Sequence, residues 1–247
     1  MTEVAIIGGT GLRTLSGLAI TRRLVKQTPY GEPSGPFIYG LYCDKEVVFL
    51  ARHGIAHAIP PHRVNYRANL WALKNLGVTR IISIAAVGGI TAELSPGRIA
   101  FPDQIIDYTW SRDHTFFEED LDQVIHIDFT RPYCEALRRI LVQAADKAGI
   151  QAINSGTYGA TQGPRLETAA EINRLERDGC TMVGMTGMPE TALARELELG
   201  YATCAVVANW AAGRGGEEPI TLPIIVKNLT KGMEQVRKLL EYAIPML

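Results

Sequence analysis

The sequence predicts an α/β fold in a single domain that spans residues 1–247. Short apolar segments alternate with segments of helical periodicity along the whole chain, which is typical of a largely parallel, buried sheet with helices packed on it. No linker, low-complexity run or internal repeat divides the chain. Hydrophobic residues make up 47% and charged residues 21% of the sequence, which is ordinary for a globular protein with a packed core.

The first half of the chain is expected to form strands at residues 4–7, 46–51, 80–86 and 99–107. A helix is expected over residues 63–76, ending at Gly77, because apolar side chains share one face at helical spacing: Val64, Ala68, Trp71 and Leu76. A second helix is expected around the apolar positions Leu137, Ile140, Leu141 and Ala144.

The second half of the chain repeats this alternation. Strands are expected at residues 155–161, 181–185 and 201–208. Helices are expected at residues 167–177, 189–198 and 229–243. Because the two kinds of element alternate to the end, the α/β prediction covers the full length.

The charge balance indicates neither a nucleic-acid nor a membrane partner. The 25 Lys and Arg residues against 26 Asp and Glu residues leave a net charge of -1, and no apolar window approaches the length of a membrane span. The start of the chain lacks the basic segment of a signal peptide. No CxxC pair or Cys/His cluster at metal spacing occurs, so we expect no metal and reduced thiols in a cytoplasmic protein; the cysteines are Cys43, Cys134, Cys180 and Cys204.

Several candidate ligand-binding positions fall directly after predicted strands. Ligands of α/β sheets bind at the carboxyl ends of the strands, so these positions are expected to converge on one site. They are Thr10, Arg52-His53, Ala85-Ala86, Met185-Thr186 and Asn209.

The first two of these motifs suggest an anion site, although each has a simpler interpretation. The turn Gly8-Gly9-Thr10-Gly11 offers N–H groups and a hydroxyl to a phosphate, but a tight turn without a ligand explains it equally well. A dinucleotide site fits poorly because the GxGxxG pattern is not matched. The guanidinium fork of Arg52 can grip two phosphate oxygens and His53 adds a donor, whereas a surface arginine beside a loop histidine is the alternative.

The sequence resembles the methylthioadenosine phosphorylase and purine nucleoside phosphorylase family in five ordered motifs: IIGGTGL, LARHG, VNYRANLWALK, GPRLETAAE and GMTGMPE. The resemblance runs from Ile6 to the last helix. It implies one α/β domain around a mixed, partly barrelled sheet flanked by helices, assembled as a homotrimer. It also implies phosphorolysis of a purine nucleoside, with inorganic phosphate as co-substrate and no cofactor.

Carried over by position, the resemblance implies a phosphate site made by Thr10, Arg52, His53, Ala85, Ala86 and Thr186. Ala85 departs from relatives that carry a hydroxyl there, but the change leaves the backbone N–H of Ala86 in place. The nucleoside would be held by Met185, Leu166, Glu167, Asn209, Trp210 and Ala211, and His126 would reach into the site of a neighbouring subunit. A core methionine and a surface histidine are the simpler interpretations of Met185 and His126.

By the same resemblance, Asn209 and Glu167 choose the base and stabilise its departure. An amide at position 209 donates to a 6-oxo oxygen and accepts from protonated N7, while Glu167 accepts from N1–H. Relatives that take adenine carry aspartate at position 209 and at position 211, where this chain has Asn209 and Ala211. The alternative for Glu167 is an acid favoured at a helix start.

The apolar run at residues 222–226 bears on the 5′ substituent of the sugar. By position, the 5′ pocket would be walled by Leu222, Ile225 and Val226, where ordinary nucleoside phosphorylases use a histidine; a buried strand or helix start is the simpler interpretation. Both ends together imply 5′-methylthioinosine as the substrate, and hypoxanthine and 5-methylthioribose 1-phosphate as the products. The alternatives are a methylthioadenosine phosphorylase, a general 6-oxopurine nucleoside phosphorylase, an NAD-binding oxidoreductase and a non-catalytic nucleoside-binding module.

Overall fold

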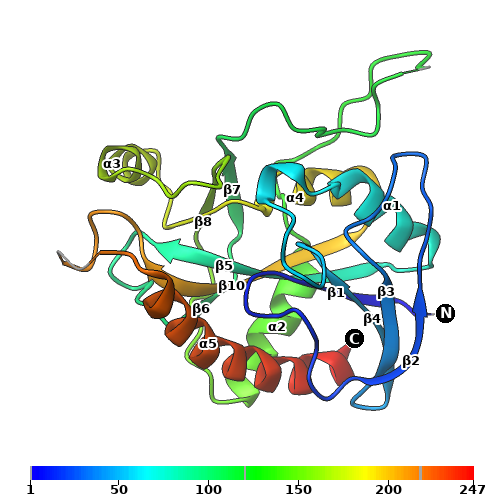
Figure 1. The fold of residues 1–247 in the computed structure, drawn as a ribbon, viewed down its shortest axis with the longest axis horizontal. Helices are drawn as coiled ribbons and strands as arrows, with labels where there is room; N and C mark the ends of the chain where they lie inside the picture. The colour runs from blue at the N-terminus through cyan, green and yellow to red at the C-terminus, as the bar shows by residue number, and fades with distance from the viewer. Residues whose placement is uncertain (1, 120, 217–218) are drawn as a thin grey trace.

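One mixed sheet, with helices on both of its faces, forms the centre of the molecule (Figure 1). The computed structural model describes residues 2–119, 121–216 and 219–247, with only the backbone of Leu222. The strand order is β2-β3-β4-β1-β5-β9-β8-β7. Outside this series, β10 pairs with β5, and β6 pairs with β10. Among the described residues β2 and β7, at the two ends, do not pair with each other, so the mixed sheet stays open.

The central strands are parallel, as the sequence predicts: β1 (Val4–Gly8), β4 (Lys45–Ala51), β5 (Arg80–Gly89) and β10 (Gly200–Trp210). Their side chains alternate between the two faces. On one face Ile6, Phe49 and Ile82 pack in the core with helices α2 (Glu135–Lys147) and α5 (Leu222–Ala243). On the other face Ile7, Leu50 and Ile81 pack with α1 (Tyr66–Asn75) and α4 (Gly187–Glu196).

A hairpin that the sequence analysis did not predict extends one edge of the sheet. Strand β2 (Ala19–Leu24) is mostly exposed, and β3 (Phe37–Tyr42) pairs antiparallel with both β2 and β4. The turn from β3 to β4 places Cys43 and Asp44 at positive φ values of 49° and 61°. Tight hairpin turns need such angles, and the Asn-Gly or Asp-Gly pairs that usually signal them are absent here.

Several predicted boundaries move. The strand expected at residues 99–107 divides into β6 (Ile99–Ala100) and β7 (Gln104–Asp107), with Pro102, which has no N–H for a ladder, between them. Helix α3 (Ala169–Arg177) starts two residues late because Thr168 and Glu171 form a capping box. Helix α5 starts seven residues early, so the run at 222–226 is the first turns of a helix.

The remaining elements complete the described chain: β8 (Thr157–Ala160), β9 (Met182–Gly184) and the 3-10 helices Pro61–Arg63 and Ile244–Met246. Between β7 and α2, residues 118–119 and 121–126 form an exposed segment that protrudes from the body of the molecule (Figure 1), whereas Arg112 and Tyr133 of the same connection are buried. No helix in the described ranges is long and apolar enough to span a membrane.

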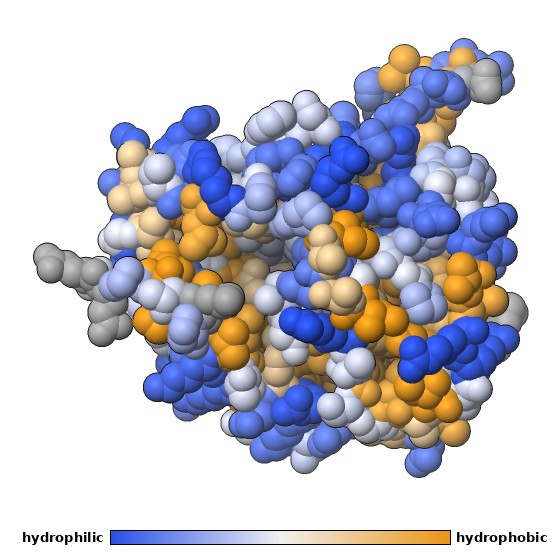
Figure 2. Space-filling view, in the orientation of Figure 1, coloured by the Kyte–Doolittle hydropathy of each residue, from blue (hydrophilic) through white to orange (hydrophobic). Residues whose placement is uncertain are grey.

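The edge of β5 is open over a short stretch, and this gap positions the site. Strand β1 pairs with β5 only as far as Ser83, and β9 joins the same strand antiparallel only at Gly88. On the space-filling face in Figure 2, apolar side chains gather in the hollow between the regions of α3 and α5, near where β5 and β10 end. The loops that leave the carboxyl ends of the strands surround this region, which is where α/β sheets bind ligands.

Candidate active site

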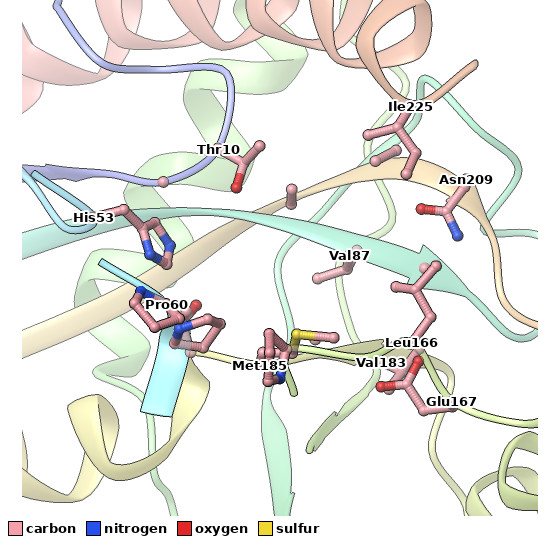
Figure 3. Close-up of a pocket in the computed structure, with 18 of the residues that line it drawn as sticks. Thr10, His53, Pro60, Val87, Leu166, Glu167, Val183, Met185, Asn209 and Ile225 are labelled. Carbon is pink, nitrogen blue, oxygen red and sulfur yellow. The ribbon is translucent and has the colours of Figure 1, made fainter. Parts of the chain in front are cut away.

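A cavity of about 420 Å³ opens at these strand ends. Most of the positions expected to converge do line it, although they come from five different loops or strands: Thr10, Arg52, His53, Ala86, Met185, Thr186 and Asn209. The cavity is elongated (Figure 3): Thr10 and His53 lie at one end, and Asn209, Glu167 and Leu166 lie at the other. Met185 and Val87 lie between these ends, which we call the Thr10 end and the Asn209 end.

The glycine turn brings the Thr10 end close to β5. A Cβ atom on Gly9 would lie 2.5 Å from the carbonyl oxygen of Ile84 and 2.9 Å from Nη1 of Arg52, so only glycine fits this approach. Thr10 follows it and faces the cavity (Figure 3). The turn is therefore required by packing, whether or not it also binds an anion.

Arg52 is fully buried, and its guanidinium fork is held by the protein itself. Nε and Nη2 donate to the two carboxylate oxygens of Glu190 at 2.6 and 2.8 Å. Nη2 also donates to Ser83 Oγ and Nη1 to the carbonyl oxygen of Ile84. A guanidinium has five N–H groups, so these four bonds leave one, on Nη1, for a ligand. The expectation that the fork grips two phosphate oxygens is corrected: the fork grips Glu190.

His53 lies beside Arg52 as a neutral ring. Burial, and next the charge of Arg52, lower the pKa of His53 to about 4. Its Nδ1 lies 2.8 Å from the carbonyl oxygen of Ile59, which can only accept, so Nδ1 carries the proton. The neutral ring therefore presents Nε2 as an acceptor toward the cavity, and not as the donor that the sequence analysis expected.

His57 is a cavity residue that the sequence analysis did not place in the site. Its Nε2 lies 3.4 Å from Thr10 Oγ1, and its ring packs edge-to-face on His53 with centroids 4.8 Å apart. The backbone of His57 has φ of +55°, in a turn that returns the chain after β4. Burial, and then the charge of Arg13, lower the pKa of His57. A positive φ at a histidine has no sequence signature, so the position could not be predicted.

A β-bulge aims Asn209 into the cavity. Val207 pairs with Val87 and Asn209 pairs with Gly88, so Ala208 is an extra residue in β10. Asn228 donates to the carbonyl oxygen of Ala208 at 2.9 Å, which satisfies the bulge. The side-chain Nδ2 of Asn209 donates to the carbonyl oxygen of Trp210 at 2.7 Å. The amide is thereby fixed with Oδ1 and the second N–H available to a ligand.

Glu167 faces the Asn209 end from the loop before α3. Its Oε1 accepts from the hydroxyl of Thr161 at 2.6 Å. Glu167 precedes the capping residue Thr168, and the acid in the first turn of the helix is Glu171. The interpretation of Glu167 as a helix-start acid is therefore wrong, and its side chain lines the cavity instead.

The apolar wall of the cavity comes partly from α5. Ile225 lines the cavity, as expected, and so do Ile220 and Ala212, which the sequence analysis missed. Ala211 is buried and lines the cavity with them. Leu222 begins α5, but its side chain lies outside the described part of the structure.

Three expected site residues do not line the cavity. Ala85 packs in the core, and Trp210 packs against Gly215. Val226 is 53% exposed on the outer side of α5. His126, expected in the site of a neighbouring subunit, is exposed on the protruding segment.

Comparison with known proteins identifies the family, because a model of the Phosphorylase superfamily matches residues 3–245. The chain belongs to this superfamily. A probable S-methyl-5′-thioinosine phosphorylase of Pseudomonas syringae pv. tomato is 55% identical, over 96% of each chain. A 6-oxopurine nucleoside phosphorylase of Pyrococcus furiosus is 46% identical, over 100% of this chain and 94% of the relative. The structure of a methylthioadenosine phosphorylase from Schistosoma mansoni in complex with adenine superposes with a TM-score of 0.95 at 34% identity, over 100% of this chain and 91% of that one.

In this phosphorylase, loss of Glu190 should be strongly destabilising. Glu190→Ala leaves the buried charge of Arg52 without its partner, so we expect a loss of about 3–5 kcal/mol in the free energy of unfolding. Glu176→Ala removes the half-exposed pair with Arg214 and should cost about 1 kcal/mol or less. Urea denaturation of both variants measures the difference. Equal losses would contradict the assignment of Arg52–Glu190 as the dominant ion pair.

The lowered pKa of His53, at the Thr10 end of the cavity, predicts that the free energy of unfolding depends on pH. The pKa of His53 in the folded chain, about 4, lies below the value of about 6.5 in an unfolded chain. The unfolded state therefore binds more protons between these values, and stability should fall as pH falls from about 6.5 to about 4. Urea unfolding of the unmodified chain and of His53→Gln across this range tests it. The variant should lose part of the slope, and an unchanged slope would rule His53 out as its source.

Proposed function

We propose that this chain catalyses the phosphorolysis of 5′-methylthioinosine to hypoxanthine and 5-methylthioribose 1-phosphate. The observation that carries the proposal is the pairing of Asn209 and Glu167 at one end of a cavity whose other end presents Thr10 and a free N–H of Arg52. Relatives named S-methyl-5′-thioinosine phosphorylase, 51–55% identical to the chain, support it. Inorganic phosphate is the co-substrate, and no cofactor is required.

Phosphate occupies the Thr10 end and attacks the anomeric carbon of the ribose. Donors around it are the Thr10 hydroxyl, the remaining N–H of Arg52 and the hydroxyl of Thr186, which makes no capping bond to α4. Nε2 of His53 accepts a hydrogen bond from the P–O–H group of hydrogen phosphate, and the proton stays on the phosphate. Phosphate is already a nucleophile, so these groups position it instead of activating it.

The purine occupies the Asn209 end, where charge develops as the glycosidic bond breaks. The second N–H of Asn209 donates to the 6-oxo oxygen, and Oδ1 accepts from N7 as that atom gains a proton. Glu167 accepts from N1–H. These bonds strengthen as the base leaves, and an interaction that is stronger in the transition state raises the rate.

The ribose lies over Met185 between the two ends, with its 5′ substituent against the first turns of α5. Ile220 and Ile225 give this wall an apolar character that suits a methylthio group. A 5′-hydroxyl buried there without a partner would cost about 1–3 kcal/mol. Activity on ordinary 6-oxopurine nucleosides is the second candidate function, favoured by the relative named for it, because Asn209 and Glu167 select the base and not the sugar.

We also propose a cytoplasmic homotrimer. The protruding segment carries exposed apolar side chains, with Val124 75% and Ile125 43% exposed, next to His126. Apolar side chains gathered on one exposed segment are typical of a protein interface.

All four cysteines are free thiols, which suits a reducing compartment.

The direct test incubates the purified protein with methylthioinosine, methylthioadenosine and inosine, with and without phosphate, and identifies the bases released. We expect hypoxanthine from methylthioinosine only when phosphate is present. Release that is independent of phosphate would indicate hydrolysis. Binding of purines without turnover would indicate a nucleoside-binding module, and binding of NAD would indicate an oxidoreductase.

Base selection should depend on Asn209 and Glu167. With adenine bound, the Asn209 N–H would face the exocyclic amine and Glu167 would face an N1 lone pair. Two such conflicts of about 1–3 kcal/mol each predict a preference for methylthioinosine over methylthioadenosine of about thirtyfold to twenty-thousandfold in kcat/KM. Asn209→Asp should reduce the preference, and adding Glu167→Ser should reduce it further, non-additively. Comparable kcat/KM for both nucleosides in the unmodified enzyme would refute this assignment.

Sugar selection should respond to a polar group at Ile225 but not at its neighbour. Ile225→Asn supplies a partner for a 5′-hydroxyl, so the ratio of kcat/KM for inosine to that for methylthioinosine should rise by about tenfold. Val226→Asn is the matched control, because Val226 is exposed and does not line the cavity. If both variants shift the ratio equally, or neither does, Ile225 does not contact the 5′ substituent.

A further inference from the structure

Thr161, at the end of β8, is the side-chain hydrogen-bond donor to Glu167 in the described chain. Its Oγ1 lies 2.6 Å from Glu167 Oε1 and 3.4 Å from the carbonyl oxygen of Gly184. A hydroxyl has one proton to donate, and the shorter contact to a carboxylate is much the stronger. Thr161 does not line the cavity, so it acts on a ligand only through Glu167.

The backbone of Thr161 is fixed on both sides. Its N–H donates to the carbonyl oxygen of Gly184 at 2.8 Å, and its own carbonyl accepts from Nη2 of Arg112 at 3.2 Å. Arg112 is buried and also donates to the carbonyl oxygens of Gln162 and Met185, at 2.8 Å each. Arg112 thereby links the backbone that carries the Thr161 hydroxyl to the loop that contains Met185.

The nearest exposed cation is directed elsewhere. Arg165 pairs with Glu171 through both Nη atoms, at 2.8 and 2.7 Å. Had Arg165 paired with Glu167, the carboxylate would lie toward solvent with its charge neutralised. Instead a neutral hydroxyl holds Oε1, and within the described residues no hydrogen bond is made to Oε2, which leaves it for a donor on the ligand.

We propose that Thr161 is a positioning residue that aims Glu167 at the N1–H of a 6-oxopurine. The proposal rests on the proposed function, since it requires a purine at the Asn209 end. The Thr161 hydroxyl occupies Oε1 of Glu167 and so directs Oε2 to the ligand. The other charged groups around Glu167 are Arg165, Glu171 and Arg174 in the adjoining groove and Arg112 behind Thr161.

The test compares Thr161→Val and Thr161→Ser with the unmodified enzyme on methylthioinosine and methylthioadenosine. Valine keeps the shape and removes the donor, so kcat/KM for methylthioinosine should fall by about tenfold or more, with little change for methylthioadenosine. Serine should restore both the rate on methylthioinosine and the preference for it. Thr181→Val, a threonine beside β9 that does not line the cavity, is the matched control and should change neither.

Two outcomes overturn the proposal. Equal losses on both nucleosides in Thr161→Val would indicate a general structural role. No rescue by serine would point to packing of the threonine methyl group. Failure of the proposed function is recognised separately, because the unmodified enzyme would then show no phosphate-dependent release of hypoxanthine.

Discussion

The buried ion pair between Arg52 and Glu190 joins the elements that surround the Thr10 end of the cavity. Arg52 follows β4, Glu190 lies in α4, and Ser83 and Tyr201, on β5 and β10, both donate to the same carboxylate. An unpaired charge at this depth would be very costly in free energy. The two buried charges are therefore tolerated only while β4, β5, β10 and α4 keep their relative positions. The pair has a chemical consequence as well. It neutralises the arginine, so this end of the cavity presents directed N–H and O–H donors with little net positive charge.

The Asn209 end is built in a different way, from interruptions in regular structure. The open edge of β5 between Ser83 and Gly88 makes room for a ligand, and the bulge at Ala208 turns Asn209 toward it. Glu167 lies on a loop, held by a single hydroxyl. These irregularities are what place the two polar side chains at the cavity.

The sequence predicted what is local and missed what depends on distant contacts. Thr10, His53 and Met185 follow apolar runs or glycine turns, so their place at the strand ends could be read from neighbouring residues. The partner of Arg52 could not, because Glu190 lies 138 positions away and looks like an ordinary helix acid. The bulge at Ala208 and the left-handed backbone of His57 have no sequence signature either. Motif position does not state whether a strand side chain reaches a cavity, and Ala85 and Trp210 do not line this one.

The division between the two ends bears on how substrate choice can change within one fold. The Thr10 end depends on a buried network in which altering one member leaves another unsatisfied, so changes there carry a large cost in stability. The Asn209 end and the first turns of α5 consist of half-buried side chains on a bulge, a loop and a helix start, where one residue can change without disturbing the core. Relatives named for methylthioinosine, 6-oxopurine nucleosides and methylthioadenosine share this fold, the last at 34% identity with a TM-score of 0.95. A shared architecture with different named substrates is the expected outcome when the Thr10 end of the cavity belongs to the folding core and the Asn209 end does not.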